Sequence, residues 1–128
     1  MVVVDTSVLV DFFRGKLSES VIQLKRCVSE SAAAVTPIIR AEILSGAHDD
    51  REYVKLEQYL ETLQLLQGPS DLWNLVAQAR FRLARKRVQS QLLDLSIAIT
   101  ANHFNCQLLT VDKNFEEISR EIPIRLFS

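Results

Sequence analysis

Hydrophobic positions along the chain fall into short continuous runs and into longer stretches with a period of three to four residues. The continuous runs have the length of strands and cover residues 2–4, 32–36, 107–111 and 124–127. The periodic stretches indicate amphipathic helices and cover about residues 7–14, 18–30, 37–46, 50–63, 70–83, 92–104 and 115–119. Short strands that alternate with helices predict an α/β domain with a mainly parallel sheet.

The expected helix boundaries rest on residue types that commonly begin and end helices. The expected caps of first turns are Ser18, Thr36, Asp50 and Ser70. Thr36 is the strongest of these signals, because it precedes Pro37 and proline fits the first helical position. The helix that begins there is expected to carry Glu42 and to end near Gly46.

Composition narrows the class of protein. The chain has 128 residues, of which 48% are hydrophobic and 24% charged, so we expect one globular domain spanning residues 1–128. The net charge of −1 excludes a polycation that coats nucleic acid, so any polyanion must be held by a local patch or by bound cations. Two cysteines are too few for a disulfide framework, and no stretch is apolar enough to span a membrane, so we expect a cytoplasmic protein.

Four acidic residues stand out from their local sequence. Asp5 and Asp112 each follow an apolar run, where an aspartate on its own often only begins a turn. Both are also placed for chemistry, because the functional crevice of a parallel sheet lies at the carboxyl ends of its strands. Asp94 lies in the apolar segment LLDLSIAI, and a buried carboxylate needs a partner or a cation. Glu42 is open to two interpretations, a surface glutamate near a helix start or a fourth member of this group.

If the four acids meet in one crevice, a divalent cation is the simplest way to balance their charge. Two carboxylates about 4 Å apart repel each other by roughly 4 kcal/mol at an effective dielectric near 20. All-oxygen ligation suits Mg²⁺ or Mn²⁺ rather than zinc, and His48 and His103 are expected at the surface or at helix ends. Cations held by acids at strand ends suit phosphoryl transfer, in which the cation activates a water and neutralises phosphate charge.

A cluster of basic residues offers a patch for a phosphate backbone. The cluster lies in the segment ARFRLARKR and comprises Arg80, Arg82, Arg85, Lys86 and Arg87. The alternative interpretation is a solvated helix end whose positive charges favour the helix dipole. Phe81 in the same segment is expected to pack in the core rather than to stack on a base.

Three segments, DTSVLVDFFRG, TPIIRAEILSGA and LLDLSIAITANHFNCQLLTVDKNFEEI, together resemble a PIN domain. Their order and spacing are most similar to the VapC-type toxins of bacterial toxin–antitoxin pairs. The resemblance covers nearly the whole chain and implies a PIN-like three-layer α/β fold, with a mainly parallel five-stranded sheet flanked by helices. It also implies an endoribonuclease that leaves a 5′-phosphate, a homodimer, and a cognate VapB-like antitoxin whose tail blocks the site.

The resemblance further implies roles for individual residues. The implied ligands of Mg²⁺ or Mn²⁺ are Asp5, Glu42, Asp94 and Asp112. The candidates for supporting these acids are Thr6, Ser7, Thr110 and Asn114. Glu42 is expected to bind a second cation or to orient the attacking water. Asn114 departs from the family pattern, since many relatives have a further acid at that position.

Other functions that place an aspartate after a first strand fit less well. A phosphatase of the haloacid dehalogenase type needs a second aspartate two positions on, where this chain has Ser7. A response-regulator receiver domain needs an adjacent acid pair and a late lysine, and nucleotide hydrolysis lacks a glycine-rich phosphate loop here. The remaining alternative is a catalytically weak PIN domain that acts as an RNA- or protein-binding module.

Overall fold

A parallel β-sheet forms the centre of the computed structural model, which describes residues 1–127. Its strands within that range are β1 (Val2–Val4), β2 (Ala33–Val35), β3 (Gln64–Leu65), β4 (Gln107–Leu109) and β5 (Arg125–Leu126). They lie in the order β3-β2-β1-β4-β5, and every neighbouring pair is parallel. The predicted α/β class with a five-stranded, mainly parallel sheet is confirmed.

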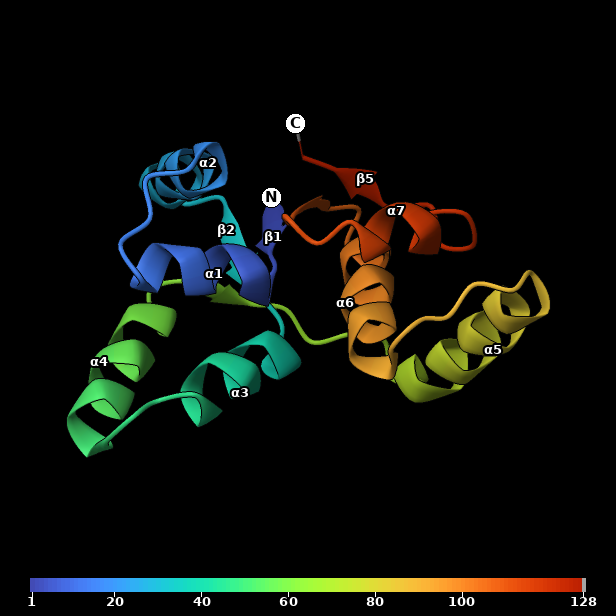
Figure 1. Cartoon of the computed structure of the whole chain (residues 1–128), viewed down its shortest axis with the longest axis horizontal. Helices are drawn as coiled ribbons and strands as arrows, with labels where there is room; N and C mark the ends of the chain where they lie inside the picture. Colours follow the sequence, from blue (N-terminus) through green and yellow to red (C-terminus); the bar gives the residue numbers. More distant parts are fainter. Residues whose placement is uncertain (128) are drawn as a thin grey trace.

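Helices connect the strands and cover both faces of the sheet (Figure 1). Within residues 1–127 they are α1 (Thr6–Phe13), α2 (Glu19–Ser29), α3 (Pro37–Ser45), α4 (Asp50–Leu60), α5 (Leu72–Arg85), α6 (Leu92–His103) and α7 (Asn114–Ile118). Figure 1 shows α5 beside α6 on one side of the molecule, with α3 and α4 on the other. No helix in the described part of the chain is both long and apolar enough to cross a membrane.

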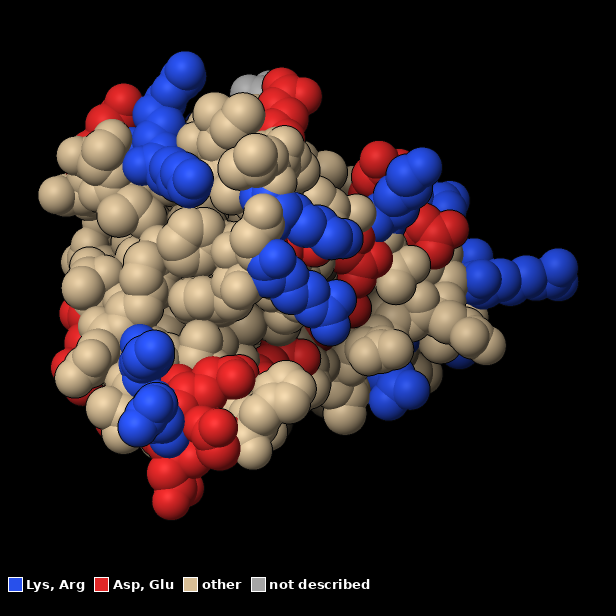
Figure 2. Space-filling model, turned by 60° about the vertical axis from the view of Figure 1, so that its left-hand side comes forward, with Lys and Arg blue, Asp and Glu red and all other residues tan. Residues whose placement is uncertain are grey.

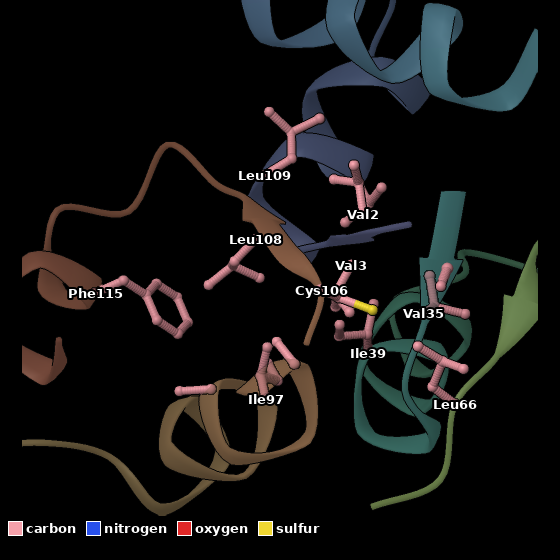
Figure 3. Packing of buried hydrophobic residues seen from close by; sticks show 14 of the residues in the cluster. Val2, Val3, Val35, Ile39, Leu66, Ile97, Cys106, Leu108, Leu109 and Phe115 are labelled. Carbon is pink, nitrogen blue, oxygen red and sulfur yellow. The ribbon is translucent and has the colours of Figure 1, made fainter. Parts of the chain in front are cut away.

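The sheet is buried by apolar side chains on both faces (Figure 3). Val3 pairs with Leu108 in the parallel register, so their side chains share a face, where Ile97 of α6 and Phe115 of α7 pack. Leu109, one residue further, points to the opposite face. Strands covered on both sides read as continuous apolar runs, which is why β1 has the sequence Val-Val-Val.

Two of the four expected helix caps are confirmed. The hydroxyl of Ser18 accepts a hydrogen bond from the amide of Val21 at 3.3 Å, and Thr36 accepts one from Ile39 at 3.4 Å. The cap of α4 is Asp49 rather than Asp50, since Asp49 accepts from the backbone. The expected cap at Ser70 is also wrong, because α5 begins two residues later, at Leu72, after a short turn.

The strands are shorter than most of the expected runs, with β2 and β5 each one residue shorter at both ends, and the largest differences are at β3 and β4. β3 was not expected, because it has only two residues, both exposed, and is defined by its pairing with β2. β4 ends at Leu109 rather than Val111, because the chain turns at Thr110, whose hydroxyl accepts a hydrogen bond from the Asp112 amide at 3.0 Å. β1 and β4 are neighbours, so the residues that follow them meet at one edge of the sheet.

Candidate active site

Asp5, directly after β1, is a buried carboxylate held by two hydroxyl groups. Its side chain is 5% exposed, and its Oδ2 atom accepts hydrogen bonds from Ser7 Oγ and Thr110 Oγ1, both at 2.8 Å. The Asp5 amide donates to the Leu109 carbonyl at 2.9 Å, which ties the end of β1 to the end of β4. The carboxylate is therefore fixed in position, with Oδ1 left for another partner.

The same hydroxyls organise the loop that carries Asp112. Thr110 Oγ1 accepts from the Asp112 amide, and Ser7 Oγ accepts from the Val111 amide at 3.3 Å. Asp112 in turn uses Oδ1 to accept from the Asn114 amide at 2.9 Å, at the start of α7. Ser7 and Thr110 thus bond both to the Asp5 carboxylate and to the backbone of the loop that carries Asp112.

Glu42 is exposed on α3, yet its side chain is held in place. Thr6 Oγ1 donates to Glu42 Oε1 at 2.8 Å, across 36 residues of sequence. The bond joins the first turn of α1, which follows Asp5, to the helix that Thr36 caps. Within residues 1–127, Glu42 Oε2 is engaged by no ion pair.

Asp94 lies in the first turn of α6 and is partly buried. Burial and, in decreasing order, the negative charges of Asp112, Asp5 and Glu42 together raise its pKa to about 6. Those charges act on Asp94 because the three acids lie near it in the fold, although they are distant from it in sequence. Within residues 1–127 none of the four forms an ion pair with a lysine, arginine or histidine.

The donor set fits a hard divalent cation. All four side chains offer carboxylate oxygens, and at least Asp94 carries a charge that nothing nearby balances. As the side chains are oriented, however, no three His, Cys, Asp or Glu residues in the described range stand close enough to hold one ion together. Binding would therefore require the carboxylates to turn inward about their side-chain bonds.

Four of the five residues in the predicted basic cluster divide into two groups, and the fifth, Arg85, lies over the Phe81 ring. Arg82 and Lys86 form ion pairs with Glu121, at 3.6 Å and 2.9 Å. Arg80 and Arg87 instead line a pocket of about 780 Å³ that also contains Asp94 and Asn114. Asp94 and part of the basic segment are thus brought together in one pocket.

The prediction that Phe81 is buried is wrong, whereas the prediction that the two histidines lie at the surface is confirmed. Phe81 is 62% exposed and lies under the guanidinium of Arg85, with 5.3 Å from Arg85 Cζ to the ring centre, so the expectation that it packs in the core is wrong. His48 and His103 are both exposed, as expected. On the face shown in Figure 2, basic and acidic side chains are interspersed around a broad uncharged area, which agrees with the near-zero net charge.

Sequence reasoning missed two features near the acids. Ser90 Oγ is buried and has no hydrogen-bond partner within residues 1–127, and no sequence pattern marks it. Glu121 anchors α5 through Arg82 and Lys86, residues 35 or more positions away, so only the fold reveals the pairing.

A second pocket, of about 710 Å³, lies beside Glu42 and has Val10, Phe13 and Leu56 in its wall.

Solved structures with the same fold include a toxin–antitoxin complex, VapBC2 from Rickettsia felis bound to a DNA fragment from its promoter. One of its chains matches with a TM-score of 0.78 and 21% identity, covering 99% of this chain and 98% of that one. FitAcB from Neisseria gonorrhoeae matches with a TM-score of 0.75 and 18% identity, covering 100% of this chain and 97% of that one. These structures share the fold.

Two curated relatives are more similar to this chain in sequence than these solved structures are. VapC ribonuclease Mb1587 of Mycobacterium bovis and ribonuclease VapC11 of Mycobacterium tuberculosis are each 32% identical to this chain over 124 residues, which are 94% of this chain and 92% of each relative. The PIN domain model matches residues 2–121. The chain therefore belongs to the PIN domain family, with VapC ribonucleases among its homologues.

Proposed function

We propose that this protein is a metal-dependent endoribonuclease and the toxin of a type II toxin–antitoxin pair. The observation that carries the proposal is the partly buried Asp94 carboxylate, whose pKa is raised by burial and by the charges of Asp112, Asp5 and Glu42, and which forms no ion pair in the described range. The names of the VapC ribonuclease relatives support RNA as the substrate. Such a crevice attracts a divalent cation, and the cation in turn attracts a phosphodiester.

The residues have distinct roles in this proposal. Asp5, Asp94 and Asp112 would hold Mg²⁺ or Mn²⁺, which supplies an activated water and neutralises charge on the phosphate. Glu42 keeps Oε1 on Thr6 and offers Oε2 to orient the water and accept its proton. The water would attack phosphorus as the bond to the 3′ oxygen breaks, and the 3′ oxygen would take up a proton from solvent, which leaves a 3′-hydroxyl and a 5′-phosphate. Ser7 and Thr110 hold Asp5 in position throughout.

We further propose a VapB-like antitoxin as partner and a homodimer as the working form. Structures such as the VapBC2 complex of Rickettsia felis support an antitoxin partner. The pocket beside Glu42 supplies apolar surface next to the acids, suited to a tail that blocks the crevice. The two cysteines, Cys27 and Cys106, are free and buried, which suits the reducing cytoplasm.

A second candidate is a catalytically weak PIN domain that binds RNA or protein. It is favoured by one observation, that no three potential ligands in residues 1–127 are already gathered around a common point. In that case the acids would bind cations weakly and cleavage would be slow or absent.

Cleavage of total cellular RNA by the purified protein tests the proposal. Reactions contain Mg²⁺, Mn²⁺ or a chelator, with the Asp5→Asn variant alongside. Asp11→Asn is the matched control, because Asp11 lies on α1 and pairs with Lys16 at 3.3 Å, outside the crevice. We expect discrete fragments with 5′-phosphates, lost with chelator and in Asp5→Asn but kept in Asp11→Asn. Intact RNA under every condition, despite measurable cation binding, would favour the binding module.

A further inference from the structure

The pocket beside Asp94 is built to receive more than a cation. It lies between the second half of α5, residues 88–91, the start of α6 and α7, and its volume is about 780 Å³. Pockets of 300–1,000 Å³ commonly hold small organic ligands, so there is room here for a nucleotide. Figure 1 shows the chain turning back from the end of α5 towards the start of α6, which gives the pocket one of its walls.

The positive charge of this pocket comes from two arginines that other contacts leave available. Arg82 and Lys86 are engaged by Glu121, and Arg85 lies over the Phe81 ring. Arg80 and Arg87 line the pocket and form no ion pair within residues 1–127. A guanidinium is the side chain best suited to bind phosphate oxygens through two parallel hydrogen bonds.

Ser90 gives independent support for a ligand. Its Oγ atom is buried without a hydrogen-bond partner in the described range, and the residue lines the same pocket. A buried hydroxyl without a partner is costly, so native structures rarely keep one unless another group supplies the bond. A phosphate oxygen in the pocket would accept a hydrogen bond from Ser90 after rotation about its χ1 bond.

The backbone of Arg87 provides a clean way to test its side chain. Arg87 has a φ of 62° and follows the last turn of α5, where its amide donates to Ala84 and the Val88 amide donates to Leu83. This helix ending favours glycine. Ser31 and Asn105 take the same conformation at the ends of α2 and α6, so the conformation alone carries no function. It means that Arg87→Gly removes the side chain without disturbing the fold.

We propose that Arg80, Arg87 and Ser90 form a binding subsite for a phosphodiester of single-stranded RNA, next to the bond that is cleaved. The inference rests on the proposed nuclease function and deepens it. The arginines offset the repulsion between the RNA backbone and the Asp94 carboxylate in the same pocket. The RNA strand therefore crosses the end of α5 and residues 88–91 on its way to the acids.

Binding of a fluorescently labelled single-stranded RNA of mixed sequence tests this assignment. The full chain carries Asp5→Asn in all samples, so that RNA is not consumed, and is compared with added Arg87→Gly, Arg80→Gln or Arg82→Gln. We expect Arg87→Gly and Arg80→Gln each to weaken RNA binding about tenfold. Arg87→Gly should also reduce the slope of log K against log salt by about 0.7, the value for one lost phosphate contact. Arg82→Gln should change the affinity less than twofold, and the melting temperature of Arg87→Gly should be unchanged or higher.

Three outcomes would overturn the subsite. The first is an RNA affinity of Arg87→Gly and Arg80→Gln within twofold of the parent. The second is a loss of RNA affinity in Arg82→Gln equal to the loss in those two variants. The third is that Arg87→Gly and Arg80→Gln lose affinity for a polyglutamate peptide, measured in parallel, but keep their affinity for RNA. The last would assign the pocket to an acidic protein segment. Cleavage by the chain without Asp5→Asn is measured separately, so failure of the subsite is distinguishable from failure of the nuclease proposal.

Discussion

The hydroxyl of Thr110 links two of the four acids. It donates to Asp5 Oδ2 at 2.8 Å and accepts from the Asp112 amide at 3.0 Å. Groups that orient ligands in this way set the geometry in which a cation is bound, without touching it. The side chain that follows β4 is therefore as important for the proposed site as the acid two residues later.

Thr110→Val should weaken Mn²⁺ binding and RNA cleavage by about 10- to 100-fold, since valine keeps the shape but neither hydrogen bond. Mn²⁺ affinity is measured by calorimetry and cleavage on a fixed RNA. Thr62→Val is the matched control, because the Thr62 hydroxyl bonds only to the Tyr59 carbonyl of its own turn. Unchanged Mn²⁺ affinity in Thr110→Val would contradict a positioning role.

Asp94 should make the stability of the metal-free protein depend on pH. Its pKa in the fold is about 6, above its ordinary value, because of burial and the charges of Asp112, Asp5 and Glu42. The folded state therefore holds this proton more tightly than the unfolded chain does, and the stabilisation is lost as the pH rises from about 4 through about 6. The difference in unfolding free energy between the parent and Asp94→Asn, measured with urea and a chelator, should shift in favour of the variant over that interval. A pH-independent difference would exclude this role of Asp94.

The helices and strands show which parts of a fold can be predicted from local sequence. Thr36 with Pro37, and Ser18 before an amphipathic stretch, mark helix starts by side-chain chemistry that acts over three residues. The choice between Asp49 and Asp50 depends on backbone angles that two adjacent aspartates do not reveal. β3 exists only through its partner β2, so no local pattern predicts it.

In the candidate site too, features set by local sequence were predicted and features that depend on distant residues were not. Asp5, Asp112 and Asp94 were predicted because strand ends and an acid among apolar residues are local signals, whereas Glu42 was assigned only through the resemblance to a family. The division of the basic cluster depends on Glu121, and the orphan hydroxyl of Ser90 depends on the packing of residues 88–91. Phe81 was expected in the core, but it is exposed and the Arg85 guanidinium lies over its ring.

Gly68, between β3 and α5, is a point where elements approach too closely for a side chain. A Cβ atom there would lie 2.8 Å from Thr100 Oγ1 and 3.1 Å from Leu72 Cδ2. Thr100 is buried and donates to the Ser96 carbonyl, so it cannot move aside freely.

Gly68→Ala should therefore lower the unfolding free energy by about 1–3 kcal/mol. The matched control is Gly46→Ala, whose Cβ would meet nothing closer than 3.6 Å and whose effect should stay within about 0.5 kcal/mol. Urea denaturation of both variants checks this expectation. Equal stabilities would mean that α5 and α6 can separate at this junction without loss.

At the scale of the whole molecule, charge is balanced globally but not locally. Sixteen acidic and fifteen basic residues nearly cancel, and the two signs are interspersed on the face in Figure 2. The charges of Asp112, Asp5 and Glu42 nevertheless act together on Asp94, and none of these four acids forms an ion pair in the described range. A ligand that binds only the folded state stabilises it, so a cation in the crevice should be visible in the stability of the entire chain.

We expect Mn²⁺ at about 100 times its dissociation constant to stabilise the fold by about 2.7 kcal/mol, a rise in melting temperature on the order of 10 °C. Thermal unfolding with Mn²⁺ and with chelator measures the rise, which Asp11→Asn should keep and Asp5→Asn should lose. Asp94→Asn should melt above the parent in chelator at pH 7, since one repelling charge is gone, and below it in saturating Mn²⁺, since a ligand is gone. This reversal in the order of the two melting temperatures would identify Asp94 as a cation ligand. If Asp94 only destabilised the fold, its replacement would raise the melting temperature under both conditions. An Mn²⁺-induced rise that is equal in all four proteins would locate the cation outside the crevice.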